Sequence, residues 1–262
     1  MQLNSLFTHT AKGDEIGYLR HGSGQKKLLF IHGNLASSLW WRKSLDAIMP
    51  GYEAYAIDLP GTGGTPETGT RHTLDYLAAF VNDFTEALRL NRFHLVGHSM
   101  GGGIAQLIAI NYPEKVEKLI LVNSIAMDGF RMDFDYDDNM MRMVMKNEPL
   151  VRHWLRAVMP HMEDDALFDQ IVVNAMKSSE QVFVEHPRAM VEANWAERID
   201  KIQCPALFVH GAEDDFIPKA GSERTARAIK NCTFTYMDNC GHSPMLEIPR
   251  AFNDLMFDFF EK

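Results

Sequence analysis

Short apolar runs that alternate with longer amphipathic segments constrain the fold of this chain more than any other feature of its sequence. Each run is four residues long and is closed within two residues by Gly, Asp or Asn, which is typical of a buried strand. Strands that take turns with helices predict a mostly parallel sheet with helices on its faces. The runs are 28–31, 54–57, 93–96, 119–122 and 206–209.

Amphipathic segments between these runs predict helices whose limits follow from capping and helix-breaking residues. Residues 74–88 place apolar side chains on one helical face, and Thr73 precedes them as an N-cap. A second helix is expected over 101–112, where Pro113 stops it. A third is expected over 251–260, with several Phe side chains packed against the sheet.

Composition and charge limit the kinds of partner. Hydrophobic residues make up 46% of the 262 residues, enough to bury the core of one α/β domain. Lys and Arg number 26 against 35 Asp and Glu, and the net charge of −9 would repel nucleic acid and anionic lipid headgroups. We therefore expect no nucleic acid and no membrane as partners, while the oligomeric state stays open.

Cysteine usage and the absence of a targeting signal predict a cytoplasmic protein. Cys204, Cys232 and Cys240 are odd in number and have spacings that fit neither a disulfide framework nor a zinc site, which favours free thiols. The first ten residues lack a basic stretch leading into an apolar run, and no 18 apolar residues follow one another. No nucleotide loop and no set of metal ligands with a usual spacing is found, so we expect neither a cofactor nor a metal.

The alternation of strands and helices breaks off between residues 125 and 199. This segment holds ten of the 16 methionines, together with Trp154 and Trp195. Flexible thioethers fill adaptable apolar surfaces, so a cap that lines a pocket is one interpretation and an ordinary helical core is the other. We favour a core domain made of 1–124 and 200–262, with 125–199 as a helical cap.

A serine lies on the turn between an expected strand and an expected helix. Gly97 and Gly101 stand two residues before and two after Ser99, which gives the pattern G-x-S-x-G. So tight a turn leaves no room for side chains at these two positions. The turn exposes the serine hydroxyl next to the backbone N–H groups of the helix N-terminus. A reactive serine needs this position.

A base and an acid for this serine are found downstream. A hydroxyl needs a general base to take its proton, and a carboxylate must hold that base in one tautomer. His242 lies in a loop after an expected strand, and Asp214 lies just beyond another strand. Glu213 and Asp215 are rivals for the role of Asp214. The order Ser99, Asp214, His242 is that of an α/β hydrolase.

In this order and in four motifs the chain resembles the α/β-hydrolase family, over nearly all of its length outside 125–199. The motifs are His32-Gly33-Asn34 with Trp41 downstream, the turn 58–63 (DLPGTG), the serine turn 97–101 (GHSMG) and the acid loop 211–218 (GAEDDFIP). The resemblance implies a mostly parallel α/β sheet of eight strands flanked by helices, with a helical cap inserted after strand 6.

The resemblance also implies roles for single residues. Nucleophile, acid and base fall on Ser99, Asp214 and His242. The backbone N–H groups of Asn34 and Met100 would form the oxyanion hole; Asn34 is preferred to its neighbour because the family's donor usually follows the His-Gly pair directly. We expect the substrate to contact the cap and the loops around the serine, at Leu35, His98, Ser124, Met141, Met145 and Trp154.

These features predict a cofactor-free serine hydrolase that cleaves a small acyl ester or a lactone through an acyl-enzyme intermediate. A carbon–carbon bond hydrolase, a thioesterase and a perhydrolase with the same triad are alternatives. A small-molecule receptor of the same fold with little turnover is an alternative from another functional class.

Overall fold

The computed structural model describes residues 5–130 and 137–262. Eight strands form one sheet in the order β1-β2-β4-β3-β5-β6-β7-β8. β1 and β2 are antiparallel to their neighbours, whereas all pairs from β4 to β8 are parallel. The strands are β1 (Leu6–His9), β2 (Glu15–Gly22), β3 (Lys26–Ile31), β4 (Tyr52–Ile57), β5 (Phe93–His98), β6 (Val116–Val122), β7 (Ala206–Gly211) and β8 (Cys232–Met237).

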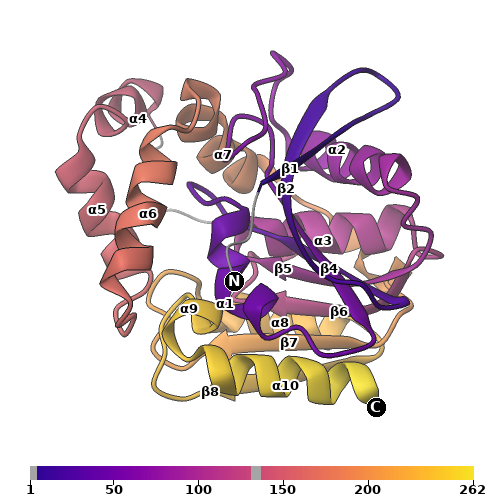
Figure 1. Ribbon diagram of the computed structural model, residues 1–262. Coiled ribbons are helices and arrows are strands. Elements are labelled where there is room, and N and C mark those ends of the chain that lie inside the picture. The colour runs from indigo at the N-terminus through magenta and orange to yellow at the C-terminus, as the bar shows by residue number, and fades with distance from the viewer. Residues whose placement is uncertain (1–4, 131–136) are drawn as a thin grey trace.

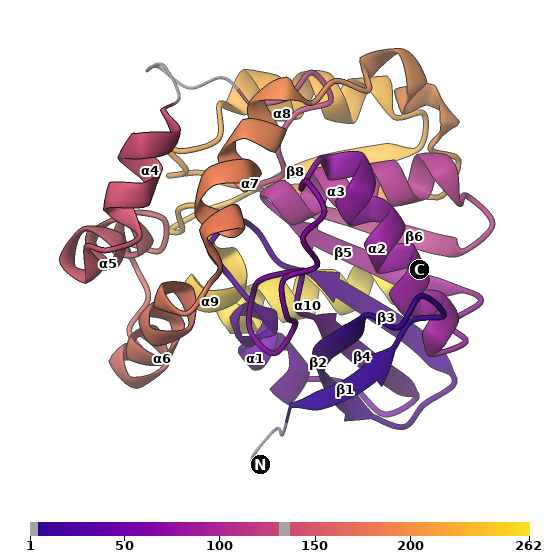
Figure 2. The ribbon, with the colours of Figure 1, turned by 90° about the horizontal axis from the view of Figure 1, so that it is seen from above.

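Helices cover both faces of the sheet (Figures 1 and 2). α2, α3 and α8 lie on one face, and α1, α9 and α10 lie on the other. The helices are α1 (Arg42–Asp46), α2 (Leu74–Ala87), α3 (Met100–Asn111), α4 (Asp138–Val144), α5 (Glu148–Ala157), α6 (Asp165–Met176), α7 (Glu180–Glu192), α8 (Lys219–Ala228), α9 (Pro244–Glu247) and α10 (Pro249–Glu261), with short 3-10 helices η1 (Ser38–Trp41) and η2 (Ala196–Lys201).

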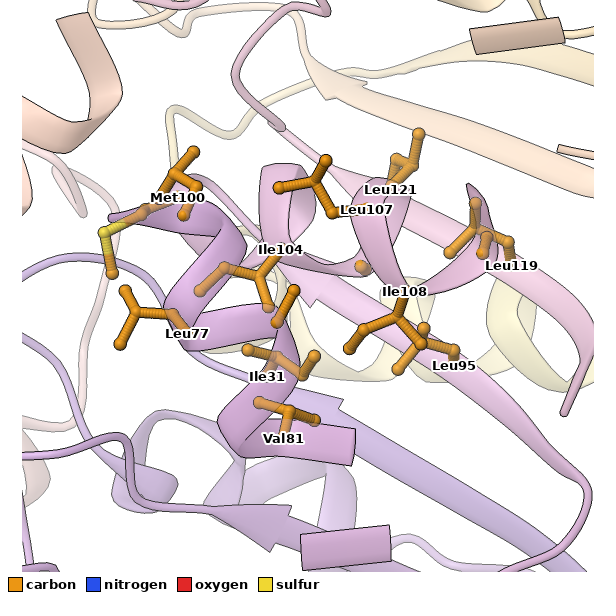
Figure 3. Close-up of a cluster of buried hydrophobic side chains, with 14 of the residues drawn as sticks. Ile31, Leu77, Val81, Leu95, Met100, Ile104, Leu107, Ile108, Leu119 and Leu121 are labelled. Atoms are coloured by element: carbon orange, nitrogen blue, oxygen red, sulfur yellow. The ribbon is translucent and has the colours of Figure 1, made fainter. Parts of the chain in front are cut away.

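The central strands are buried on both faces, as their continuous apolar runs predict. Leu95 and Leu121 contribute to the core beneath α2 and α3, whereas their neighbours Val96 and Val122 contribute to the core on the other face. Figure 3 shows the first of these cores, where side chains of α2 and α3 meet those of β3, β5 and β6. Adjacent residues of a strand therefore stabilise opposite layers, which fixes the register of the sheet.

All five apolar runs are strands, and the mostly parallel sheet of eight strands is confirmed. The three expected helices correspond to α2, α3 and α10. Thr73 caps α2 as expected, since its hydroxyl accepts a hydrogen bond from the N–H of Tyr76 at 3.1 Å.

Four helices, α4 to α7, lie between β6 and β7, where the alternation of strands breaks off. We call them the inserted helices. Side chains that cap helix N-termini mark where all four of them begin: Asp137 accepts from an N–H of α4, Asn147 from one of α5, Asp164 from one of α6 and Ser179 from one of α7. They form a group beside the ends of the strands (Figure 1). Within the described residues, no helix is both long and apolar enough to cross a membrane.

Candidate active site

Ser99 occupies the turn between β5 and α3 with a strained backbone. Its φ of 55° and ψ of −121° lie in a region that residues other than glycine rarely adopt. A Cβ on Gly97 would lie 2.3 Å from the carbonyl oxygen of Gly101, and a Cβ on Gly101 would lie 2.3 Å from that of His32. Both glycines are therefore required by packing, which is the physical reason for the G-x-S-x-G pattern.

His242 and Asp214 lie within hydrogen-bonding distance, 2.9 Å from Nδ1 to a carboxylate oxygen, Oδ2. Asn123 donates from its amide to the same oxygen, and the N–H groups of Phe216 and Ile217 donate to Oδ1 at 2.8 and 3.1 Å. Burial opposes ionisation of Asp214, but the nearby imidazole and these donors hold its pKa well below its usual range. A carboxylate accepts only from Nδ1–H, so Nε2 of His242 is left with the free lone pair that a general base needs.

The two rival acids do not reach this histidine. Glu213 faces outward, with its carboxylate 2.8 Å from Nε2 of His161. Asp215 is exposed. Of the three adjacent carboxylates, the structure brings only Asp214 to the imidazole of His242.

His98, on β5, contacts the loop that carries His242. Its Nε2 is 2.9 Å from the carbonyl oxygen of His242, so Nε2 carries the proton and donates it. The ring stacks on Trp40 with 5.4 Å between centroids. Burial lowers the pKa of His98 well below its usual value, which keeps this residue neutral.

Asn34 and Met100 border the serine as expected. Asn34 lines the cavity described below, and Met100 is the buried first residue of α3. The Asn34 side chain accepts the N–H of Leu35 at 2.9 Å. The N–H of Leu35 therefore already has a hydrogen-bond partner in this loop.

A cavity of about 340 Å³ opens beside Ser99 and His242. Its wall comes from the loop after β3, from the serine turn and from three of the inserted helices. The lining residues are Asn34, Leu35, Trp40, His98, Ser99, Met141, Trp154, Leu155, Ala157, Val158, Pro187, Met190, Phe216 and His242. Apart from a few polar groups near Ser99, this lining is apolar, which is typical of a small-molecule site.

The structure brings four of the six expected substrate contacts to this wall, namely Leu35, His98, Met141 and Trp154. Ser124 is fully buried elsewhere, where its hydroxyl accepts from the Gln106 amide at 2.9 Å. Met145 is half-buried and packs against the hydrophobic core on the side of the sheet that carries α1, α9 and α10.

Methionines of the 125–199 segment divide between two environments. Met141 and Met190 line the cavity, whereas Met159 and Met162 belong to the core. Met143 is 73% exposed, and Met132 lies outside the described residues. Methionines of this segment therefore contribute both to the cavity wall and to the core.

Sequence reasoning missed two residues around the acid. Asn123 directly follows β6, at the carboxyl edge of the sheet where ligands usually bind, and this position was the available signal. Phe216 presses its ring edge-on against His242, with 5.1 Å between centroids. No sequence pattern distinguishes this Phe from those in the core.

Comparison with known proteins gives the same fold. Human monoacylglycerol lipase ABHD6 is 27% identical over 256 residues, covering 88% of this chain and 74% of the lipase. The enol-lactonase of Burkholderia xenovorans LB400 superposes with a TM-score of 0.87 at 18% identity, over 98% of this chain and 100% of that one. The esterase EaEST of Exiguobacterium antarcticum superposes with a TM-score of 0.86 at 19% identity, over 99% and 100%.

A family model also matches most of the chain. Residues 26–249 match the model described as the alpha/beta hydrolase fold. This span contains the serine turn, the acid loop and His242, as well as the inserted helices. The chain therefore belongs to the α/β-hydrolase fold family.

Proposed function

We propose that this protein is a cofactor-free serine hydrolase that cleaves carboxylic esters or lactones with Ser99 as nucleophile, His242 as base and Asp214 as acid. The observation that carries the proposal is the hydrogen bond of 2.9 Å between His242 and Asp214, at the wall of a cavity that Ser99 also lines. No step of the proposed reaction requires a metal or an organic cofactor.

The reaction proceeds in two acyl transfers. Ser99 Oγ attacks the substrate carbonyl carbon while Nε2 of His242 takes the hydroxyl proton, and the same nitrogen then gives that proton to the departing alkoxide. Water attacks the resulting ester of Ser99 with His242 again as base. The carboxylic acid leaves, and the serine hydroxyl recovers its proton. Asp214 stabilises the imidazolium formed in each half of the reaction.

Backbone N–H groups stabilise the oxyanion that forms on the carbonyl oxygen. We assign this role to Asn34 and Met100, because Met100 directly follows Ser99 as the first residue of α3 and Asn34 lines the cavity that Ser99 also lines. The N–H groups at the start of a helix have no partner within the helix and point toward incoming negative charge.

The substrate is a small, largely apolar acyl ester or lactone held by the inserted helices. Residues 125–199 act as the cap, over a core formed by 1–124 and 200–262. Support comes from the apolar lining by Met141, Trp154 and Met190 and from the similarity to a monoacylglycerol lipase. We also propose a cytoplasmic location, which the three free cysteines support.

A hydrolysis screen tests the proposal. We would measure steady-state turnover of p-nitrophenyl esters of graded chain length, of lactones and of thioesters, with the wild-type protein and Ser99→Ala side by side. Turnover of esters or lactones that Ser99→Ala abolishes is the expected result. Binding without turnover would favour the receptor alternative, and activity that survives in Ser99→Ala would contradict the mechanism.

A further inference from the structure

Asn123 occupies the point where β6 ends, between the strand of the serine and the strand of the acid. It is fully buried and has a φ of 43°, in the left-handed region that Asn tolerates better than most residues. Its N–H still donates to the carbonyl of Val209 at 2.9 Å, which continues the pairing of β6 with β7. The bend in the backbone aims the Asn123 side chain at the loops that carry Asp214 and His242.

The Asn123 amide forms hydrogen bonds with three groups: the Asp214 carboxylate, the carbonyl of Gly241 and the N–H of Gly211 at the end of β7. Nδ2 donates to Oδ2 of Asp214 and, at 3.4 Å, to the carbonyl of Gly241, directly before His242. Oδ1 accepts from the N–H of Gly211 at 3.3 Å. The orientation of the amide follows from its partners, because a flipped amide would place its oxygen against two acceptors and its NH2 group against a donor.

We propose that Asn123 is a positioning residue for the reaction, which holds Oδ2 of Asp214 in line with Nδ1 of His242 and ties both loops to the end of β6. This inference rests on the proposed function. Of the four groups that donate to the Asp214 carboxylate, two are backbone N–H groups and one is His242 itself. The fourth donor is the side-chain amide of Asn123. A single substitution of Asn123 therefore removes this contact without changing the imidazole of His242.

Other titratable side chains face the pair from neighbouring elements. His98 lies on β5 and His210 on β7, and burial lowers the pKa of each, which keeps both neutral. Glu247 on α9 accepts the N–H groups of Gly241 and Ser243 at 3.0 and 2.8 Å. Asn123 is uncharged, so its contribution is an oriented donor rather than a charge.

The test uses two variants of Asn123 and a matched control. Asn123→Gly accepts a φ of 43° and removes the amide. Asn123→Asp keeps its size and places a second carboxylate beside Asp214, so that the two share a proton at low pH and repel each other when it leaves. Asn253→Asp controls for the cost of a buried carboxylate, because Asn253 is also buried but its amide donates to the carbonyl of Lys43, away from the triad.

Steady-state kinetics on the best ester and thermal unfolding are measured for each variant across the pH profile. We expect Asn123→Gly to lower kcat by about 10- to 100-fold, as for the loss of a hydrogen bond to a charged group, with KM changed by less than about threefold. The kcat of Asn123→Asp relative to wild type should fall as the pH rises. Asn253→Asp should keep its kcat.

The outcome separates this inference from the proposed function. If Ser99→Ala abolishes turnover but a folded Asn123 variant keeps kcat within about threefold of wild type at every pH, Asn123 is not a positioning residue. If one variant fails to fold, the other decides. A fall in kcat of similar size in Asn253→Asp would also overturn the inference, since it would show a general effect of core polarity.

Discussion

The hydroxyl of Ser243 donates a hydrogen bond to the backbone carbonyl oxygen of Val158 at 2.7 Å. Ser243 directly follows His242, and Val158 directly follows α5 and lines the cavity. The loop that carries the proposed base is therefore fastened to the wall formed by the inserted helices. We therefore expect binding in the cavity and the position of the proposed base to be coupled through this contact.

Ser243→Ala should weaken that coupling. Loss of the bond leaves the Val158 carbonyl without this donor and should cost about 1 kcal/mol of unfolding free energy, while KM for the best ester rises. Urea unfolding and steady-state kinetics measure the two effects. Ser222→Ala is the control, because this buried hydroxyl has no hydrogen-bond partner in the described part of the chain. Equal effects of both substitutions would contradict the coupling.

Ser99 should react with a fluorophosphonate probe. An activated serine hydroxyl attacks phosphorus as it attacks an acyl carbon, so labelling reports the nucleophile without knowledge of the natural substrate. Mass spectrometry should place the label on Ser99, and Ser99→Ala and His242→Ala should both lose it. A label on another serine would move the nucleophile there.

Asp214→Asn should lower kcat by about 10⁴-fold, the size of the effect for the corresponding change in the chymotrypsin triad. The amide keeps the shape of the carboxylate but favours the wrong tautomer of His242. Glu213→Gln and Asp215→Asn should each change kcat by less than about tenfold, because neither side chain reaches the imidazole. Assays of the three purified variants at one pH would show which carboxylate is the acid.

Glu67 accepts a hydrogen bond from Ser179, the N-cap residue of α7, and low pH should weaken this contact. Burial opposes ionisation of this carboxyl, but hydrogen bonds from His72 and Ser179 lower its pKa to about 2. A carboxyl with a depressed pKa stabilises the fold above its unfolded pKa, and this stabilisation is lost as the pH falls through the folded value. Glu67→Gln should therefore lower the unfolding free energy at neutral pH, by an amount that shrinks as the pH falls from about 4.5 toward 2.

Urea unfolding of both proteins across this range measures the difference. Glu192→Gln is the matched control on α7, since Glu192 forms an exposed ion pair with Arg71 that should contribute at most about 1 kcal/mol. A Glu67→Gln effect that does not vary with pH would mean that its ionisation does not stabilise this contact.

Substitutions in the cavity wall should shift the preferred chain length of the acyl group. Each buried CH2 contributes up to about 0.8 kcal/mol, so activity should rise from acetate toward medium chains until the cavity is filled. Trp154→Ala, Met141→Ala and Met190→Ala should move this optimum to longer chains. Met143→Ala is the control, because this side chain is 73% exposed. An unchanged profile in every folded wall variant would place specificity elsewhere.

Local patterns predicted the central strands and the serine turn because each depends on contacts between near neighbours in sequence. The apolar runs 28–31 and 93–96 need only two buried faces, and the turn at Ser99 needs two glycines. β1 and β2 were not identified as strands, because these outer strands lack continuous apolar runs and pair antiparallel at the sheet edge.

The wall of the cavity was harder to predict because it depends on tertiary packing. Met141 and Met145 are four residues apart and share an apolar character, yet only Met141 lines the cavity. Ser124 follows β6 as Asn123 does, but its side chain packs against Gly102 of α3, where a Cβ would lie 2.3 Å from the Ser124 hydroxyl oxygen. The different directions of the Asn123 and Ser124 side chains follow from a backbone bend at Asn123 that no local pattern specifies.

β6 and β7 are neighbours in the sheet and run in parallel register, with Leu119 beside Ala206 and Val122 beside Val209. The chain that leaves the sheet after Val122 therefore returns only one strand away, and the intervening segment can grow or shrink without altering any strand pairing. A longer loop adds little to the free energy of closure, because the entropic cost of bringing its ends together rises only with the logarithm of its length. We therefore expect that the segment between β6 and β7, which supplies part of the cavity wall, can change in length without moving the strand ends beside Ser99 and Asp214.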